Sequence, residues 1–332
     1  QVEEKPTGEI AAGAGVGTEG TSFMFTLKEN NYLGRGLKVE TSINASQSAL
    51  RGGLNITNPN YNYSGNSLYG GINSTKNDSA DSGYENTITQ VNIGTRFEQY
   101  DDIYLSPNIS AAFDSLTVQS TASDNLKKQA GDYFDTYINF NLDYDKRNQK
   151  FQTTDGFRSF YSIDLPILSE KNTVTNFYNY KIFSELYENN ITSLGFSLKT
   201  ANSLTDDDIK LSERLYIPQK QLRGFINGGI GPKDGDDFIG GNYYAVINLN
   251  SSLPQVLPNS QNFEVATFVD IGNLWGVDDP SLDTSSKIRS SVGIGVDWFT
   301  PVGPMSFSLA QPLTKEKTDK TETFRFNLGT TF

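Results

Sequence analysis

The chain of 332 residues contains no cysteine and no histidine. Without cysteine there is no disulfide, thiolate metal site or thiol nucleophile. Without histidine there is no Ser-His triad, and the commonest general base and metal ligand are missing. A site built from an unaided serine or carboxylate is the weakest alternative. We therefore expect no enzymatic activity, no catalytic residues, no metal site and no cofactor.

Long hydrophobic runs are also missing. The mean hydropathy is -0.46, and no run of about 18 apolar residues predicts a transmembrane helix. The net charge is -12, which disfavours nucleic acid as a partner. These values do not exclude a transmembrane β-barrel, because such a barrel alternates apolar and polar residues and its average hydropathy resembles that of a soluble protein. The 17 Tyr and 21 Phe residues would supply an aromatic girdle at the membrane interfaces.

Short segments that alternate at period two cover the chain from Gly8 onward, separated by Gly, Asn, Asp and Pro. Such alternation is typical of half-buried strands, and no amphipathic helix of normal length interrupts it. Their number comes to about sixteen, an even number as bacterial single-chain barrels require. We predict an all-β fold, a transmembrane antiparallel β-barrel over residues 8–332. A soluble sandwich would produce the same alternation.

One long segment, from Asn202 to Gly241, lacks periodicity. A loop of this length is usually functional, and in a barrel we expect it to fold into the lumen. Its most specific part is Leu222-Arg223-Gly224-Phe225, an arginine within a glycine-rich turn. The guanidinium fork suits a carboxylate, and Phe225 supplies an apolar anchor. A surface loop with an incidental arginine is the alternative.

The first and last strands both contain glycines where strands need side chains. Gly13, Gly15 and Gly17 stand at alternate positions of the first strand, and Gly329 interrupts the last. Glycine costs conformational entropy and offers nothing to pack, so the junction of these strands is predicted to be weak. A bend or close approach at a barrel corner is the alternative for the first strand. In the last strand, Phe326 and Phe332 fall on the apolar face.

Taken in order, these segments resemble the BamA family of outer-membrane barrel-assembly insertases and its superfamily. The resemblance rests on the arginine motif at residues 222–225 and on further signatures along the whole chain. These are Thr18-Glu19, Asn30 to Gly34, Thr57 to Pro59, Thr154 to Gly156, Gly240 to Asn242, Val269 to Trp275, Trp298 to Pro304, Ala310 to Pro312 and the terminal Phe326 to Phe332. It further implies that residues 1–7 are the remnant of the last periplasmic POTRA domain or a linker, with the other POTRA domains missing.

The resemblance implies that Arg223 docks against Asp270 on the inner barrel wall. Where the family commonly offers a second carboxylate, this sequence has Asn250. It also implies a lateral gate between the first and last strands, formed here by Gly13, Gly15, Gly17, Phe326, Gly329 and Phe332, through which β-barrel proteins are inserted without ATP. The partners implied are unfolded outer-membrane β-barrel clients, outer-membrane lipids and accessory lipoproteins, in a Gram-negative outer membrane.

Three other functions compete with this interpretation. A TamA-like insertase or a two-partner-secretion polypeptide transporter belongs to the same superfamily. A passive porin would show an eyelet of opposing charges and no docked arginine loop.

Overall fold

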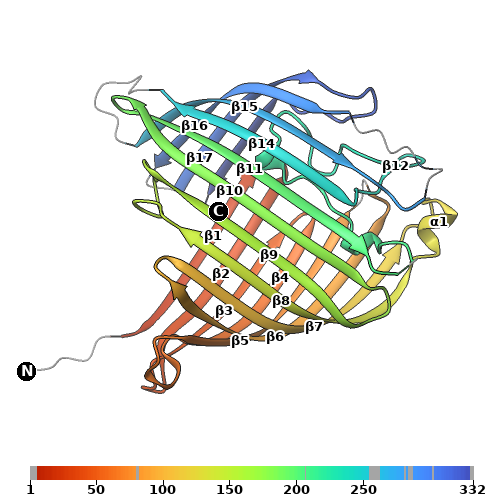
Figure 1. Ribbon diagram of the computed structural model, residues 1–332. Coiled ribbons are helices and arrows are strands. Elements are labelled where there is room, and N and C mark those ends of the chain that lie inside the picture. Colours follow the sequence, from red (N-terminus) through yellow and green to blue (C-terminus); the bar gives the residue numbers. More distant parts are fainter. Residues whose placement is uncertain are drawn as a thin grey trace, which may run out of the picture.

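Sixteen antiparallel strands form a closed barrel in the computed structural model, which describes residues 6–79, 82–205, 207–253, 262–279, 282, 287–300 and 303–329 (Figure 1). The predicted fold and approximate strand number are confirmed. The barrel strands are β1 (Gly8–Gly17), β2 (Gly20–Tyr32), β3 (Leu37–Ser46), β4 (Ala49–Asn58), β5 (Ser67–Ser79), β6 (Tyr84–Tyr100), β7 (Ile103–Val118), β8 (Gly131–Asp145), β9 (Gly156–Ser169), β10 (Thr173–Tyr187), β11 (Asn190–Ser203), β14 (Tyr243–Ser252), β15 (Phe263–Trp275), β16 (Arg289–Thr300), β17 (Gly303–Thr314) and β18 (Phe324–Gly329).

The few helical segments in the described part of the chain are short. They are η1 (Tyr61–Tyr63), α1 (Asp124–Lys127), η3 (Leu211–Glu213) and η4 (Gln219–Gln221). Helix α1 lies in the polar connection that follows β7. None of the helices in the described ranges is long and apolar enough to cross a membrane.

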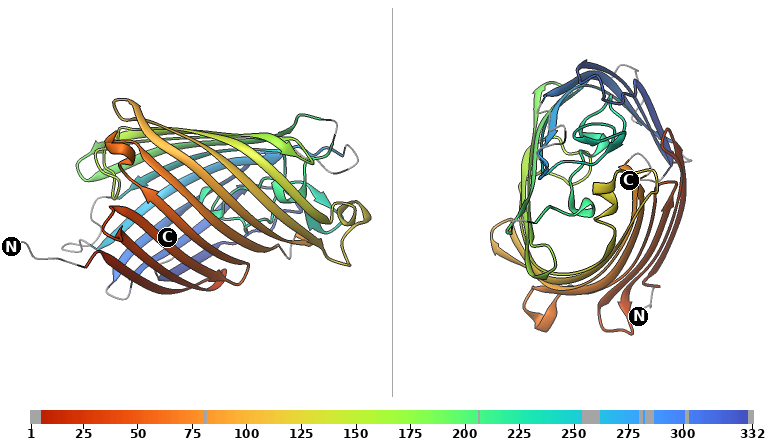
Figure 2. Two further views of the ribbon diagram at one scale, coloured as in Figure 1. Left: turned by 90° about the horizontal axis from the view of Figure 1, so that it is seen from below. Right: turned by 90° about the vertical axis from the view of Figure 1, so that its right-hand side faces the viewer.

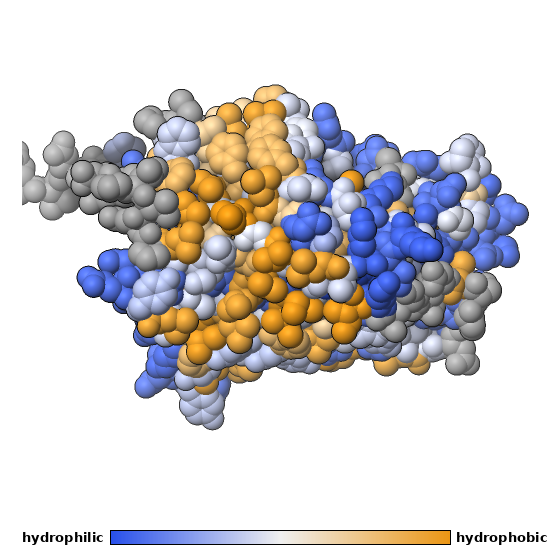
Figure 3. All heavy atoms as spheres, turned by 90° about the horizontal axis from the view of Figure 1, so that it is seen from above, coloured by the Kyte–Doolittle hydropathy of each residue, from blue (hydrophilic) through white to orange (hydrophobic). Residues whose placement is uncertain are grey.

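The outer face of the wall is apolar because alternate side chains of each strand point outward. On β2, for example, Phe23, Phe25 and Leu27 are exposed while the residues between them face inward. Figure 3 shows one face, where hydrophobic residues occupy the left and central parts and hydrophilic residues gather at the right-hand end. That end is the one where α1 and β12 (Lys233–Asp234) lie in Figure 1. We call it the plug end, and the opposite end, where β1 begins, the N-terminal end.

Residues 204–241 leave β11 at the plug end and fold into the barrel (Figure 2, right). We call this segment the plug loop. The loop contains η3, η4 and a hairpin of β12 with β13 (Asp237–Phe238), short elements that the missing periodicity of this segment did not predict. Its apolar side chains pack on the inner wall and form the main core of the protein. That core comprises Ala201, Ile209, Leu215, Ile217, Leu222, Phe225, Ile230, Tyr244, Val246 and Leu274.

The barrel closes through unequal ladders on the two sides of β1. Strand β1 pairs with β2 at all ten of its positions, from Gly8↔Glu29 to Gly17↔Gly20. With β18, which the structure describes up to Gly329, it pairs at three, Gly15↔Gly329, Val16↔Leu328 and Gly17↔Asn327. We call the β1–β18 junction the seam. Within the described residues β18 runs from Phe324 to Gly329.

Candidate functional site: the arginine lock and the seam

Arg223 reaches across from the plug loop to the inner wall, where the structure brings it together with Asp270 and Asn250. The guanidinium Nε and Nη2 atoms each donate to one oxygen of Asp270 at 2.7 Å, and Nη2 also donates to Asn250 Oδ1 at 2.8 Å. The backbone N–H of Arg223 adds a bond of 3.1 Å to Asp270. Asp270 is fully buried, while the Arg223 side chain is 21% exposed. We call Arg223, Asp270 and Asn250 the lock.

Two neighbours complete the lock, and sequence reasoning missed both. Asn248 donates to Asp270 Oδ1 and to the carbonyl of Gln221, each at 2.7 Å. The Arg223 guanidinium lies over the Phe268 ring at 3.5 Å from its centroid. A strand period of two carries the signal for both, since Asn248 precedes Asn250 and Phe268 precedes Asp270 by two residues on the inward face. The fork is thus satisfied by one charge, one amide and one aromatic face.

The other motif residues position the arginine. Leu222 and Phe225 are buried in the main core on either side of it. Gly224 has φ +92°, and a Cβ there would lie 3.2 Å from the Ala310 Cβ atom. Only glycine meets both conditions without strain, which explains a glycine directly after the arginine.

A second ionic contact holds the plug loop to the wall formed by β8 and β10. The Lys210 ammonium is 1% exposed, donates to Asp135 and lies 3.2 Å from Glu213. Glu213 also accepts from Tyr137 at 2.8 Å and from Thr173 at 2.6 Å. Burial lowers the pKa of Lys210, but Glu213 and Asp135 more than compensate and hold that pKa above its ordinary value. No pattern in the amino-acid sequence pointed to this anchor.

The plug loop also forms a backbone ladder with the linker that leads into β18. Glu322 N donates to Gly224 O at 3.0 Å, Ile226 N donates to Lys320 O at 3.0 Å, and Lys320 N donates to Gly229 O at 2.8 Å. Between them, Phe225 and Thr321 form an antiparallel bridge. We call these contacts the linker ladder. The motif that carries the lock is therefore bonded directly to the start of the last strand.

Polar side chains continue this connection to the first strand. Gln219 donates to Glu322 at 2.8 Å, and Arg325 lies 3.9 Å from Glu322 and 2.8 Å from Glu19 in the turn after β1. Thr18 N also donates to Phe326 O at 3.1 Å. Burial raises the pKa of Glu322, which the nearby Arg325 opposes.

Three of the four predicted seam glycines lie where β1 and β18 meet, and the fourth, Gly13, does not pair with the described part of β18. A Cβ on Gly17 would lie 2.7 Å from Phe326 O, and Gly329 has φ +117° with a Cβ position 2.3 Å from Ala14 O. Gly15 pairs with Gly329. Gly13 pairs with Met24 on β2 but with no described residue of β18. Phe332 lies outside the described residues.

The Omp85 superfamily domain model matches residues 31–332. The outer membrane protein assembly factor BamA of Neorickettsia risticii is 24% identical over 349 residues, covering 100% of this chain and 46% of that protein. Its counterpart from Neisseria meningitidis is 31% identical over 141 residues, covering 33% of this chain and 17% of that protein. This chain thus spans less than half the length of these curated relatives.

Solved structures show the same fold. The crystal structure of BamA from Haemophilus ducreyi lacking POTRA domains 1–3 has a TM-score of 0.89 at 23% identity, covering 98% of this chain and 70% of that one. CdiB from Acinetobacter baumannii has a TM-score of 0.59 at 13% identity, covering 99% and 61%. At these identities the likeness concerns the fold.

Proposed function

The chain belongs to the Omp85 superfamily, and from this premise we propose that it is the barrel of an outer-membrane assembly factor that folds and inserts other β-barrel proteins. Two predictions from the sequence are confirmed, the resemblance to BamA-type barrels and the location as a multi-pass barrel in an outer membrane. A Gram-negative source stays a proposal. So do the assignment of residues 1–7 to a POTRA remnant, the clients, the lipids and the accessory lipoproteins.

The single observation that supports the mechanism is the unequal pairing of β1 within the described part of the chain, ten positions with β2 against three with β18 up to Gly329. A closed barrel has no free edge, yet an incoming strand can be templated only on one. We propose that the seam opens as a lateral gate and offers the backbone of β1 to a client strand. Separating β1 from β18 exposes this edge, and in this proposal no ATP or enzymatic step is required.

In this proposal the lock stabilises the closed seam. The supporting contacts are the linker ladder and the Glu322, Arg325 and Glu19 side chains, which join the motif to both seam strands. Release of Arg223 from Asp270 would loosen the linker before β18 and lower the barrier to opening.

A disulfide across the seam tests the gate. The full-length protein with Val16→Cys and Leu328→Cys, which are paired positions, is reconstituted in liposomes with a small unfolded client barrel. Since these 332 residues contain no cysteine, the engineered pair is the sole disulfide within them. Oxidation is expected to stop client folding, measured by heat-modifiability and protease protection, and reduction to restore it.

The matched control is Val16→Cys with Thr21→Cys, which joins β1 to β2 at a paired position and leaves the seam free. It is expected to fold clients as well as the parent does. Full activity of the oxidised seam pair would refute the gate. If the parent folds clients no faster than empty liposomes but passes a polypeptide or shows a steady conductance, the transporter or the porin replaces the insertase.

A further inference from the structure

We infer that the turn between β8 and β9, residues 146–155, closes the lumen at the N-terminal end, so that the barrel has two closures in series. We call this turn the strap. The inference concerns the permeability of the barrel and does not rest on the proposed function.

The strap contacts a distant part of the wall. The Phe151 ring lies 6.1 Å from the Phe299 ring, centroid to centroid, at an interplanar angle of 72°. Phe299 is next to the last residue of β16, and β10, β11, β14 and β15 stand between β9 and β16 in the barrel order. The contact therefore spans the mouth of the barrel and does not follow the wall. Phe151 is 69% exposed, so the Phe299 ring is an apolar contact for a side chain that otherwise faces solvent.

The strap keeps its shape through its own hydrogen bonds. Asn148 N donates to Asp155 O at 3.1 Å, and the Asn148 side chain accepts from the N–H groups of Thr154 and Asp155 and donates to Thr154 Oγ1 at 2.6 Å. Gly156 closes the turn at φ +96°, where a Cβ would lie 2.1 Å from Lys146 O. Other connections at the same end are much shorter, such as residues 101–102 and 188–189. A ten-residue turn with internal bonds can cross a space that a two-residue turn cannot.

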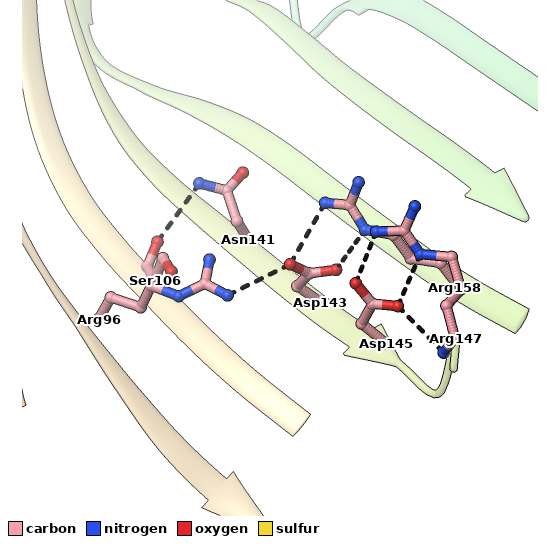
Figure 4. A network of polar contacts seen from close by, with 7 residues as sticks. All are labelled: Arg96, Ser106, Asn141, Asp143, Asp145, Arg147 and Arg158. Carbon is pink, nitrogen blue, oxygen red and sulfur yellow. Dashed lines mark hydrogen bonds and ion pairs between the residues drawn. The ribbon is translucent and has the colours of Figure 1, made fainter. Parts of the chain in front are cut away.

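Ion pairs fasten the strap to the inner wall (Figure 4). Arg147 donates from Nε and Nη2 to the two oxygens of Asp145 at 2.8 and 2.7 Å. Beside them, Asp143 accepts from Arg158 at 2.7 and 3.2 Å and from Arg96 at 3.3 Å. The base of the strap is thus fixed, and its free end depends on the aromatic contact.

A cavity of about 730 Å³ lies between the strap and the plug loop. Arg147, Lys150, Gln152 and Thr153 of the strap line it, as do Gln219, Lys220, Gln221 and Arg223 of the plug loop. Lys181 on β10 also lines the cavity. These polar and charged side chains suit water and ions, so leakage through the barrel must pass both the plug loop and the strap.

Thiol labelling inside the cavity tests this closure. Lys181→Cys gives a unique thiol within these 332 residues, and its reaction rate with a water-soluble maleimide reports access to the cavity. Adding Phe151→Ala is expected to raise this rate about two- to tenfold, the range that loss of an edge-to-face aromatic pair implies. Phe299→Ala should raise it equally, and the two changes together should add nothing further.

Tyr63→Ala is the matched control. Tyr63 is an aromatic residue in another connection at the same end and is 94% exposed, so its removal should leave the labelling rate unchanged. A labelling rate for Phe151→Ala equal to that of Tyr63→Ala would overturn the inference. In planar bilayers, Phe151→Ala should also raise the mean conductance of the Arg223→Ala protein more than that of the parent, because the closures act in series; equal effects would count against it.

Discussion

Replacing Arg223 by alanine should undock the plug loop, and the structure gives the size of the effect. Asp270 is fully buried, and of its donors among the described residues Asn248 and the backbone N–H of residue 223 would remain. Breaking a buried ion pair typically costs about 3–5 kcal/mol because the remaining charge is uncompensated. Two donors remain and Arg223 is 21% exposed, so we expect the lower end, about 3 kcal/mol.

A double-mutant cycle separates this pair from the rest of the loop. Arg223→Ala, Asp270→Asn and the double variant are compared by urea unfolding in detergent and by the rate of proteolysis within residues 204–241. Because Asp270→Asn removes the stranded charge, the double variant should be more stable than the sum of the single changes predicts, by about 2 kcal/mol or more. Asn250→Ala removes one bond to a charged group and should cost only about 1.5–3 kcal/mol. A coupling energy below about 1 kcal/mol, the value of an exposed pair, would refute the reasoning.

Two further predictions concern the plug loop. Gly224→Ala combines φ +92° with the approach to Ala310 and should destabilise the docked loop by more than about 1 kcal/mol, seen as faster proteolysis, whereas alanine at Gly235, whose Cβ position has no neighbour within 4 Å, should suffer only the backbone strain. The pKa of Lys210 is raised despite burial, through Glu213 and Asp135, so its stabilising charge is fully present below the unfolded lysine pKa and is lost as pH rises through the higher folded value. Protection of the loop should therefore persist beyond the ordinary lysine range, and Lys210→Met should remove this alkaline transition; an unchanged transition would show that another group causes it.

The barrel could be predicted from the sequence because its physical cause is local. Alternation at period two, as in Phe23, Phe25 and Leu27, places one face toward lipid and the other toward the lumen regardless of the partner strand. The glycines of β1 and β18 predict a weak junction from local sequence as well, and this stays a prediction, since Gly17 and Gly329 lie where the two backbones approach closely.

The candidate site was only partly accessible to the same reasoning. The pairing of Arg223 with Asp270 was expected from resemblance, since no local pattern joins two residues so far apart. Lys210 follows Asp207 and Asp208 and resembles part of a solvated run of charges. It is buried instead, because Asp135 on β8 forms an ion pair with its ammonium group. Phe151 stands in a polar turn, and its role depends on Phe299, which the strand pattern places elsewhere. Contacts of this kind depend on which strands face each other across the lumen.

The linker ladder has a consequence for how the chain itself folds. Residues 320–322 bond to the plug loop through Gly224, Ile226 and Gly229, and these partners are synthesised well before β18. Closing a long loop costs entropy, and the three seam pairs among residues 15–17 and 327–329 offer little to offset it. If the plug loop docks before the barrel closes, it offers residues 320–322 a fixed partner. Because these residues directly precede β18, their bonds would set the register of β18 before it pairs with β1. We therefore expect the plug loop to act as a template that positions the final strand of its own barrel.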